Sequence, residues 1–413
     1  MFRELLTFDE AQQVIRQHFR PKPLGVEEIS LLEAYRRVLA EDIAAAIDIP
    51  PFNRSTVDGY AVRAEDTFGA EENKPIRLKS CGTINVGELP KTKIASGTAA
   101  EIVTGAPIPE GADAVVMVER TVRNGDEVFV YKSVAKDENV MEAGSDIQKG
   151  ETVLKAGKSL HSREIGVLAA LGLAKVKVYV VPHVAVLSTG TEIVEPGQEL
   201  PHGRIYDINA YSLSIAVVES GGKPLYMGVF PDDMTELQRV LKRALASADV
   251  VVTSGGVSVG PKDLMPQTLN SLGKPSVVVC GIAIKPGKPT TVALIDEKPV
   301  FSLPGHPTSA LLSFHLLVRP ILRCMTGRKA EKTLKVKASA ATRMFPARGR
   351  RTFVMVKLKR DEPNGLIAEP VPVGLSGAIT TLAQADGFIE IAENQQFVGA
   401  GEEVTVQLFR RSE

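Results

Sequence analysis

The chain has 413 residues, 44% of them hydrophobic, which is enough for several cores and about two to four domains. Its 49 lysine and arginine residues balance its 49 aspartate and glutamate residues, so the formal net charge is zero. This balance argues against binding of nucleic acid or an anionic membrane by overall charge, so any anion site has to be local.

The cysteines and the N-terminus indicate a reduced, cytoplasmic protein. Cys81, Cys280 and Cys324 are odd in number and far apart, which fits neither a disulfide framework nor a metal site. We therefore expect them to be small buried hydrophobic residues. The N-terminus is charged from its third residue, and two lysines interrupt the apolar stretch 165–187, so we expect neither a signal peptide nor a membrane span.

Two capping-box patterns predict helices near the N-terminus. Thr7 and Glu10 precede apolar residues at helical spacing, which predicts an amphipathic docking helix. Ser30 and Glu33 form the same pattern and predict a second helix over residues 31–39.

The next part of the chain has the pattern of a small all-β unit. Short alternating runs over residues 76–134 are separated by glycine, proline and asparagine. Before them, residues 58–60 have the composition of a turn, in which Asp58 would bond to its own backbone. Prolines and a threonine in residues 101–111 predict a rigid, exposed loop.

From residue 184 onward, strands, loops and helices alternate, which predicts a doubly wound, mostly parallel α/β sheet. Helices are expected at 162–171, 209–220, 237–245 and 310–323. Beyond residue 325 the pattern alternates again, which predicts a second small β unit that is barrel-like.

A run of β-branched residues leads into adjacent glycines within residues 249–263, which predicts a buried strand that ends in a tight loop. Gly255 and Gly256 allow a ligand to approach the backbone, and the neighbouring polar groups suit an anion that carries a metal ion. The polar residues of the loop are Ser254, Ser258 and Asp263. The alternative is an ordinary glycine turn between a strand and a helix.

Three carboxylates follow predicted strands and are expected at the sheet edge where open α/β sheets bind ligands. They are Glu192, Asp232 and Asp263, whereas Asp249 precedes its strand and is excluded. Close carboxylates repel each other by about 1 kcal/mol per pair even in water, so a cation among them is expected, and oxygen ligands favour Mg²⁺. The alternative is that the acids cap helices, as Asp232 or Asp233 would do.

Two proline-stiffened loops follow later strands. Lys285 and Lys288 place two ammonium groups on one loop, which suits a doubly charged oxyanion, although exposed lysines are more often only solvated. Residues 304–309 form a rigid strand-to-helix turn that favours phosphate or an oxyanion; its His306 is an acid or base, or only a polar surface residue. The sequence has no nucleophile elbow and no Walker loop, which argues against nucleophilic hydrolysis and ATP-driven work.

Six motifs in order resemble the molybdopterin molybdenumtransferase family, which includes MoeA and the gephyrin E domain. They are STVDGYAVRAED, EIVTGAPIPEGADAVV, VLSTGTEIVEPGQ, TSGGVSVGPKD, IKPGKP and SLPGHPTSALLSF. The resemblance covers nearly the whole chain. It implies the last step of molybdenum cofactor synthesis, in which adenylylated molybdopterin binds, molybdate enters its dithiolene, and AMP is released in a Mg²⁺-dependent reaction.

The resemblance also implies roles for single residues. Molybdate would be held by Lys285, Lys288, Ser309 and Ser376, and the pterin nucleotide by Thr189, Gly190, Ser254, Gly255, Gly256, Ser258, Pro304, Gly305 and Pro307. Glu192, Asp232 and Asp263 would support the metal or the nucleotide. Asp58, Thr104 and Asp146 match residues that complete the site of the partner subunit in the family.

The resemblance implies an elongated homodimer of four-domain subunits. The expected parts are a helical and mixed linker and dimerisation domain in residues 1–27 and 147–180, a small β domain in 28–146, the α/β molybdopterin-binding domain in 181–327, and a β-barrel-like domain in 328–413. Expected partners are a molybdopterin adenylyltransferase and proteins that mature molybdoenzymes, and neither nucleic acid nor membrane.

The sequence departs from the family pattern at four positions. Met141 and Met355 stand where arginine is frequent, His306 stands where asparagine is usual, and Gly281 stands where some members have lysine. These changes leave open a paralogue that prefers another oxyanion, such as tungstate. Two further alternatives are a noncatalytic carrier that binds molybdopterin and an enzyme of the preceding adenylyl transfer, against which the missing ATP motif argues.

Overall fold

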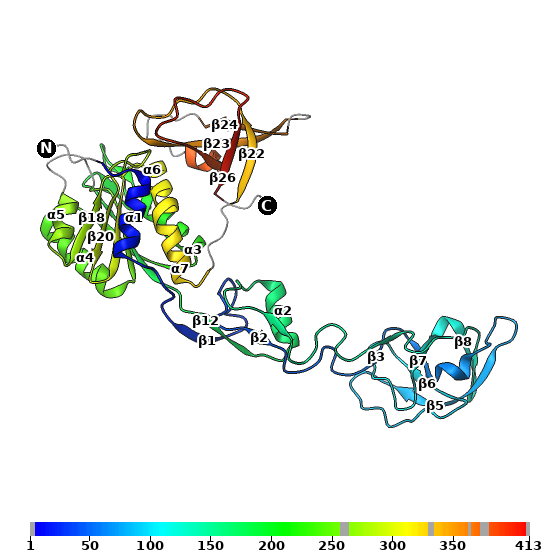
Figure 1. Ribbon diagram of the computed structural model, residues 1–413. Coiled ribbons are helices and arrows are strands. Elements are labelled where there is room, and N and C mark those ends of the chain that lie inside the picture. Colours follow the sequence, from blue (N-terminus) through cyan, green and yellow to red (C-terminus); the bar gives the residue numbers. More distant parts are fainter. Residues whose placement is uncertain (1–4, 257–263, 329–333, 362–364, 372–379, 410–413) are drawn as a thin grey trace. The chain divides into compact units, whose positions relative to one another are not determined.

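The computed structural model describes residues 5–256, 264–328, 334–361, 365–371 and 380–409. The chain divides into two compact units, drawn in Figure 1. Unit 1 comprises Met1–Glu28, Arg36–Ala40 and Lys177–Glu413, and unit 2 comprises Ile29–Tyr35 and Glu41–Val176. The expected finer division into four domains stays a prediction.

The core of unit 1 is a six-stranded sheet with the order β16-β13-β17-β21-β20-β18. Its strands are β13 (His183–Thr189), β16 (Lys223–Phe230), β17 (Val250–Ser254), β18 (Pro275–Cys280), β20 (Thr291–Ile295) and β21 (Lys298–Leu303). The first four strands in this order pair in parallel, and β20 is antiparallel to both of its neighbours. The predicted mostly parallel sheet is confirmed.

Helices cover both faces of this sheet. Successive residues of each strand point to opposite faces, so one strand contributes side chains to the core on each side. Val184 and Val186 of β13 belong to one core cluster, and Ala185 and Leu187 to the other. The first cluster contains residues of α1 (Phe8–His18), α3 (Asn209–Glu219), α6 (Pro307–Ser313) and α7 (Arg319–Met325); the second contains residues of α4 (Met234–Ser247) and α5 (Leu264–Asn270). The sheet is therefore doubly wound, as predicted (Figure 1).

The first capping box is confirmed and the second predicted helix is wrong. The Glu10 amide donates to Thr7 Oγ1 at 3.3 Å, and the Thr7 amide donates to Glu10 Oε2 at 2.8 Å, at the start of α1. Ser30 ends strand β1 (Val26–Ser30); its hydroxyl also donates to Glu33 Oε2 at 2.7 Å, but residues 31–36 form only turns. The chain cannot continue as a helix because Leu39 bridges to Val178 of β12 (Lys175–Tyr179).

The helix predicted over residues 310–323 is present, with a π-helical turn inside it at Phe314–Val318. His315 of this turn lies edge-on against the rings of Phe388 and Phe409, with centroid distances of 5.7 and 5.5 Å. Burial, and secondly the charge of Arg319, lower the pKa of His315 to about 4. The imidazole is therefore neutral at pH 7, where Arg319 Nη1 lies 3.1 Å from Nδ1 and donates to it.

Acid should destabilise the wild-type protein more than the His315→Gln variant. The folded pKa of His315 lies below the unfolded value of about 6.5, so its contribution is fully present above pH 6.5 and is lost as the pH falls toward 4. The loss can reach about 3 kcal/mol, and urea titrations followed by circular dichroism at pH 7, 5.5 and 4.5 measure it. Equal pH dependence in both proteins would show that His315 is not the group involved.

The C-terminal part of unit 1 is a second sheet that closes on itself. Its strands are β22 (Lys335–Ala340), β23 (Arg351–Asp361), β24 (Gly365–Pro370), β25 (Gly387–Ile391) and β26 (Glu403–Leu408), with a short helix α8 (Thr380–Gln384) before β25. The order β23-β24-β22-β26-β25 is closed by pairing of β25 with β23, which confirms the predicted barrel-like unit. Strand β19 (Ile284–Lys285) adds to β23 in parallel, with Lys285 opposite Thr352.

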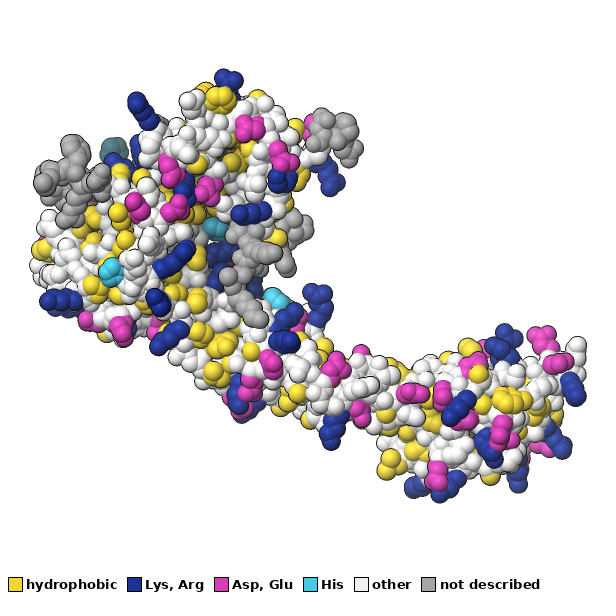
Figure 2. All heavy atoms as spheres, in the orientation of Figure 1, with side chains coloured by type: hydrophobic (Ala, Val, Ile, Leu, Met, Phe, Trp, Pro, Cys, Tyr) yellow, Lys and Arg dark blue, Asp and Glu magenta, His cyan; other side chains and the backbone are white. Residues whose placement is uncertain are grey.

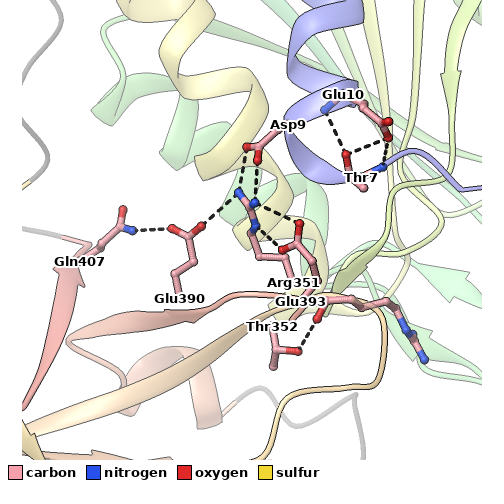
Figure 3. Close-up of polar contacts among 9 residues, drawn as sticks. Thr7, Asp9, Glu10, Arg351, Thr352, Glu390, Glu393 and Gln407 are labelled. Carbon is pink, nitrogen blue, oxygen red and sulfur yellow. Dashed lines mark hydrogen bonds and ion pairs between the residues drawn. The ribbon is translucent and has the colours of Figure 1, made fainter. Parts of the chain in front are cut away.

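Arg351 joins the barrel to helix α1 (Figure 3). Its guanidinium binds the Asp9 carboxylate in a bidentate pair at 2.9 and 2.7 Å, and its Nε donates to Glu393 at 3.0 Å. Glu390 is a third acidic neighbour at 3.3 Å, and the Arg351 side chain is only 14% exposed. The hydrogen bond from Arg351 holds the pKa of Asp9 and that of Glu393 below their usual values.

Replacing Arg351 by methionine should lower the free energy of unfolding by about 1–2 kcal/mol, because three carboxylates then face each other without a cation. Arg351→Lys keeps the charge but loses the planar fork, so its loss should be smaller. The matched control is Arg239→Met on α4, which breaks an exposed pair with Glu236 and should cost under about 0.5 kcal/mol. Urea denaturation measures all three, and equal effects of R351M and R239M would contradict this role.

Unit 2 contains the predicted all-β unit, a six-stranded sheet with the order β7-β4-β6-β5-β9-β8. Its strands are β4 (Gly59–Val62), β5 (Ile76–Ile84), β6 (Thr98–Ile102), β7 (Ala114–Met117), β8 (Thr121–Asn124) and β9 (Glu127–Val130). Unit 2 also contains two short strand pairs and a helix. The pairs are β3 (Arg54–Ser55) with β10 (Val140–Met141) and β2 (Ile43–Ala44) with β11 (Thr152–Leu154), and the helix is α2 (Ser162–Ala170).

The turn predicted at residues 58–60 is shorter than expected, because Gly59 and Tyr60 already belong to strand β4. Any Cβ on Gly59 would lie 1.8 Å from the carbonyl oxygen of Val116 on the paired strand β7. The glycine is therefore needed for close strand pairing.

The cysteines are less buried than the sequence suggested. Cys81 is exposed, and Cys280 and Cys324 are half-buried. The thiol of Cys81 donates to the Ala99 carbonyl at 3.3 Å, and that of Cys324 donates to the Pro21 carbonyl at 3.1 Å. These two side chains act as weak donors near the surface, so the expectation of three buried hydrophobic residues is wrong.

The described surface mixes both signs of charge. Figure 2 shows Lys and Arg side chains interspersed with Asp and Glu side chains on the face drawn. Among the described helices, none is both long and apolar enough to cross a membrane.

Candidate functional site

The glycine loop after β17 packs directly on the end of β13. Gly255 has φ +91°, and a Cβ there would lie 2.1 Å from the Thr189 carbonyl oxygen; a Cβ on Gly256 would lie 2.6 Å from the Thr189 hydroxyl. Side chains are therefore excluded at both positions, which leaves bare backbone at the carboxyl end of the sheet. Ser258 and Asp263 lie outside the described residues.

The turn after β21 lies against this glycine loop. The Gly255 amide donates to the Leu303 carbonyl at 3.2 Å, and Ser254 Oγ donates to the Pro304 carbonyl at 3.2 Å. A Cβ on Gly305 would lie 3.8 Å from the Cα of Gly255. The structure thus brings together the two segments expected to bind the pterin nucleotide, and Pro307 begins helix α6 directly behind them.

The lysine loop packs further along the same helix. Thr290 Oγ1 lies 3.1 Å from Ser313 Oγ, and a Cβ on Gly287 would lie 2.8 Å from Ser313 Oγ. Ser309 is buried and precedes Ser313 by four residues, so both lie on the helix face toward this loop. Lys285 is exposed at the end of β19, and Lys288 is half-buried. Ser376 lies outside the described residues.

The carboxylates lie at the other end of the sheet edge. Glu192 follows β13 and Asp232 follows β16, whereas the lysine loop follows β18, four strand spacings or about 19 Å from β13 in the sheet order. Among the described residues, Glu192, Asp232 and the lysine loop all follow strands that end at the same edge, and the opposite charges occupy its two ends. The glycine loop and the Gly305 turn lie between them.

Asp232 has a perturbed pKa. Burial raises the pKa of Asp232, and the Glu192 carboxylate raises it further. Asp233, and not Asp232, caps helix α4, since Asp233 Oδ1 accepts the Thr235 and Glu236 amides at 3.0 Å. Within the described ranges no three His, Cys, Asp or Glu residues are close enough to hold a metal, and Asp263 lies outside them. The two oxygen donors nevertheless suit a hard cation such as Mg²⁺.

A hollow of about 470 Å³ opens beside these carboxylates, at the ends of β13 and β16. It is lined in part by Gly190, Thr191, Arg204, Phe230 and Pro231. Strands β14 (Ile193–Val194) and β15 (Ile205–Tyr206) pair with each other beside it. Arg204 adds a guanidinium that no sequence motif indicated.

Asp207 and Asn209 are functional candidates that the sequence patterns did not indicate. Asp207 Oδ1 accepts the Ser188 hydroxyl at 2.9 Å and the Ala210 amide at 3.0 Å, and burial raises the pKa of Asp207. Asn209 Nδ2 donates to Ser254 Oγ at 2.8 Å and to the Gly305 carbonyl at 2.7 Å. In the sequence these residues look like ordinary polar residues at a helix start, so only the tertiary contacts distinguish them.

The remaining candidates, Asp58, Thr104 and Asp146, belong to unit 2. Asp58 Oδ1 accepts the backbone amide of Thr104 at 2.6 Å and its hydroxyl at 2.8 Å, and these bonds lower the pKa of Asp58. The expectation that Asp58 bonds to its own backbone is therefore wrong, because the loop at 103–111 supplies the donors. Asp146 is exposed, and its amide donates to the Ile49 carbonyl at 3.0 Å.

The four positions at which the sequence departs from the family pattern have different structural settings. Arg54 Nη2 lies 3.3 Å from Met141 Sδ, so a guanidinium from the paired strand β3 occupies this place. Gly281 has φ +81°, and a Cβ there would lie 2.7 Å from a Leu5 methyl group, which disfavours a side chain. Met355 is buried in the core, and His306 is exposed.

Family models match three consecutive parts of the chain. Residues 6–172 match the MoeA N-terminal region (domain I and II), residues 185–324 a probable molybdopterin binding domain, and residues 337–409 the MoeA C-terminal region (domain IV). The chain belongs to the MoeA family.

Relatives of this MoeA-family chain match it over nearly its full length. A putative molybdopterin biosynthesis protein of Methanocaldococcus jannaschii is 35% identical over 99% of this chain and 100% of its own length. A molybdopterin molybdenumtransferase of Bacillus subtilis is 34% identical over 95% and 92%. Among solved structures, a MoeA protein of Pyrococcus horikoshii has 44% identity and a TM-score of 0.85, with 99% of this chain and 100% of that chain covered.

Proposed function

We propose that this MoeA-family enzyme acts in molybdenum cofactor biosynthesis and inserts molybdate into adenylylated molybdopterin, with Mg²⁺-dependent release of AMP. The observation that carries the proposal is the arrangement of one sheet edge, with two lysines at one end, two carboxylates at the other, and backbone-lined turns between them. Such an edge fits a long substrate that has an oxyanion acceptor at one end and a nucleotide at the other.

The lysine end is proposed to hold molybdate. Lys285 and Lys288 would neutralise the two charges of the oxyanion, and the buried hydroxyl of Ser309 would donate a hydrogen bond. Ser376, outside the described residues, would be a fourth contact by family resemblance. Charge neutralisation and orientation are sufficient for this chemistry, so no covalent nucleophile is needed.

The middle of the edge is proposed to bind the pterin nucleotide. Gly255, Gly256 and Gly305 present backbone atoms without side chains, and the prolines Pro304 and Pro307 stiffen the second turn. Thr189, Gly190, Ser254 and Ser258 complete the proposed nucleotide contacts.

Glu192 and Asp232 are proposed to hold Mg²⁺, with Asp263 as a third oxygen donor outside the described residues. Because Glu192 raises the pKa of Asp232, a cation between the two would relieve their repulsion. Bound there, Mg²⁺ would supply neutralisation of phosphate charge while the phosphoanhydride is cleaved. The carboxylates themselves orient the nucleotide end of the substrate.

Asp58, Thr104 and Asp146 are proposed to complete the site of a second copy of the chain. Asp58 and Thr104 form a preorganised pair in unit 2, and Asp146 is exposed on the same unit. A homodimer that exchanges these residues would explain why they lie on a unit other than the one with the sheet edge.

The proposal is tested by AMP release from adenylyl-molybdopterin with Mg²⁺, compared with molybdate, with tungstate and without oxyanion. Release that requires molybdate supports the proposal. Nucleotide that binds but stays uncleaved under every condition would indicate a carrier instead, and release only with tungstate would keep the chemistry but change the metal. ATP consumption without AMP release from the adenylylated substrate would indicate the preceding adenylyl transfer.

A further inference from the structure

Asn209 lies where the two proposed nucleotide loops meet. Its side-chain amide donates one hydrogen bond to Ser254 Oγ at 2.8 Å and another to the Gly305 carbonyl at 2.7 Å. Ser254 ends strand β17 and Gly305 follows the neighbouring strand β21, so the first residue of helix α3 joins the ends of both strands. Asn209 is only 7% exposed, so solvent does not replace these donors.

Asn209 is itself held in place from the adjacent strand. Asp207 Oδ1 accepts the Ala210 amide and the Ser188 hydroxyl, which fixes the first turn of α3 to the end of β13. Hydrogen bonds therefore run from β13 through the start of α3 to the ends of β17 and β21. A shift of Asn209 would change the spacing of both loops.

Two polar atoms of this arrangement are buried. Asn209 Oδ1 and Asp207 Oδ2 have no hydrogen-bond partner among the described residues. A buried polar atom without a partner costs stability, and a role at a binding site is one reason for which a native protein keeps such a group.

We infer that Asn209 is a positioning residue of the nucleotide site, whose amide sets the distance between Ser254 and Gly305. The inference rests on the proposed function, because these two residues are among the proposed pterin-nucleotide contacts. Without the amide, Ser254 and the Gly305 carbonyl lose their shared donor, and the two loops separate or rotate. Nucleotide affinity then falls although no contact to the ligand has been removed.

The first test compares Asn209→Ala with Ser212→Ala in the full-length protein. Ser212 lies on the same helix, and among the described residues its hydroxyl donates to the Asn209 backbone carbonyl at 3.1 Å, a bond within the helix, so it is a matched control. We expect N209A to raise the KM for adenylyl-molybdopterin and its dissociation constant about tenfold, with kcat changed less than about twofold. S212A should leave both constants unchanged.

The second test is the pH dependence of Asn209→Asp, which keeps the side-chain shape. An ionised carboxylate cannot donate to the Gly305 carbonyl, but a protonated one can donate a single hydrogen bond. We expect the KM of N209D, relative to that of wild type, to fall as the pH is lowered from 8 to 6. A role in packing alone would give no such recovery.

Binding and turnover separate this inference from the proposed function. If wild type binds adenylyl-molybdopterin but releases no AMP, the proposed function is contradicted. In that case the inference about Asn209 is still tested by comparing the dissociation constants of wild type and N209A. Equal dissociation constants for N209A and wild type overturn the inference, as does a pH-independent defect in N209D. Failure of wild type to bind the nucleotide contradicts both.

Discussion

Replacing Lys285 and Lys288 together by alanine should lower molybdate-dependent AMP release at least about a hundredfold, because two charge-assisted contacts of about 1.5–3 kcal/mol each are lost. Each single variant should lose less than the pair. Thermal stability should stay close to that of wild type, since Lys285 is exposed and Lys288 is only half-buried. Steady-state kinetics over a range of molybdate concentrations measure the effect.

The matched control for the lysine pair is Lys223→Ala with Lys242→Ala. Both lysines are exposed on the same α/β unit, at the start of β16 and on α4, away from the edge with the glycine loop. This control should turn over like wild type, which separates a local oxyanion site from a general effect of charge. A similar loss in both double variants would place molybdate elsewhere.

Gly255→Ala should destabilise the protein by about 2 kcal/mol or more and lower AMP release about a hundredfold. The added methyl group would lie 2.1 Å from the Thr189 carbonyl oxygen, at a backbone φ of +91°. To relieve this clash, the glycine loop has to move away from β13. This movement displaces Ser254 and the turn at Gly305, which contacts the loop. Urea denaturation and turnover measured on the same preparation give both effects.

Gly69→Ala separates the cost of the backbone angle from that of the clash. Gly69 has φ +88°, nearly the angle of Gly255, but a Cβ there meets no atom within 4 Å. We expect this control to lose about 1 kcal/mol of stability and to keep the activity of wild type. If G255A behaves like G69A, close contact with β13 is not what makes the glycine necessary.

Local signals in the sequence predict most of the fold correctly. The alternation of strands and helices after residue 184 and the capping box at Thr7 identify elements that bury one or two apolar faces, and the structure contains them. The same capping pattern at Ser30 fails. There, pairing of Leu39 with Val178 outweighs the local helical preference, and such a contact with a distant segment leaves no local signal.

The candidate site depends still more on distant contacts. The edge that carries Glu192, Asp232 and the lysine loop follows from strand-end positions in the sequence, but its order depends on which strands are neighbours. Because β18 lies beyond β20 in the sheet, the lysine loop is separated from the two carboxylates, and no sequence motif determines this strand order. The contacts of Asn209 leave no local signal for the same reason, because its acceptors at Ser254 and Gly305 are 45 and 96 residues away in the chain.

The most direct test of coupled molybdate insertion is the molar ratio of AMP released to molybdenum incorporated in a single turnover. Enzyme loaded with adenylyl-molybdopterin and Mg²⁺ is mixed with molybdate, AMP is quantified by chromatography, and molybdenum in the isolated pterin is quantified by mass spectrometry. Insertion coupled to cleavage predicts a ratio of about one, with both products lost in K285A/K288A. AMP released without incorporated molybdenum, or molybdenum bound without AMP release, would contradict the account.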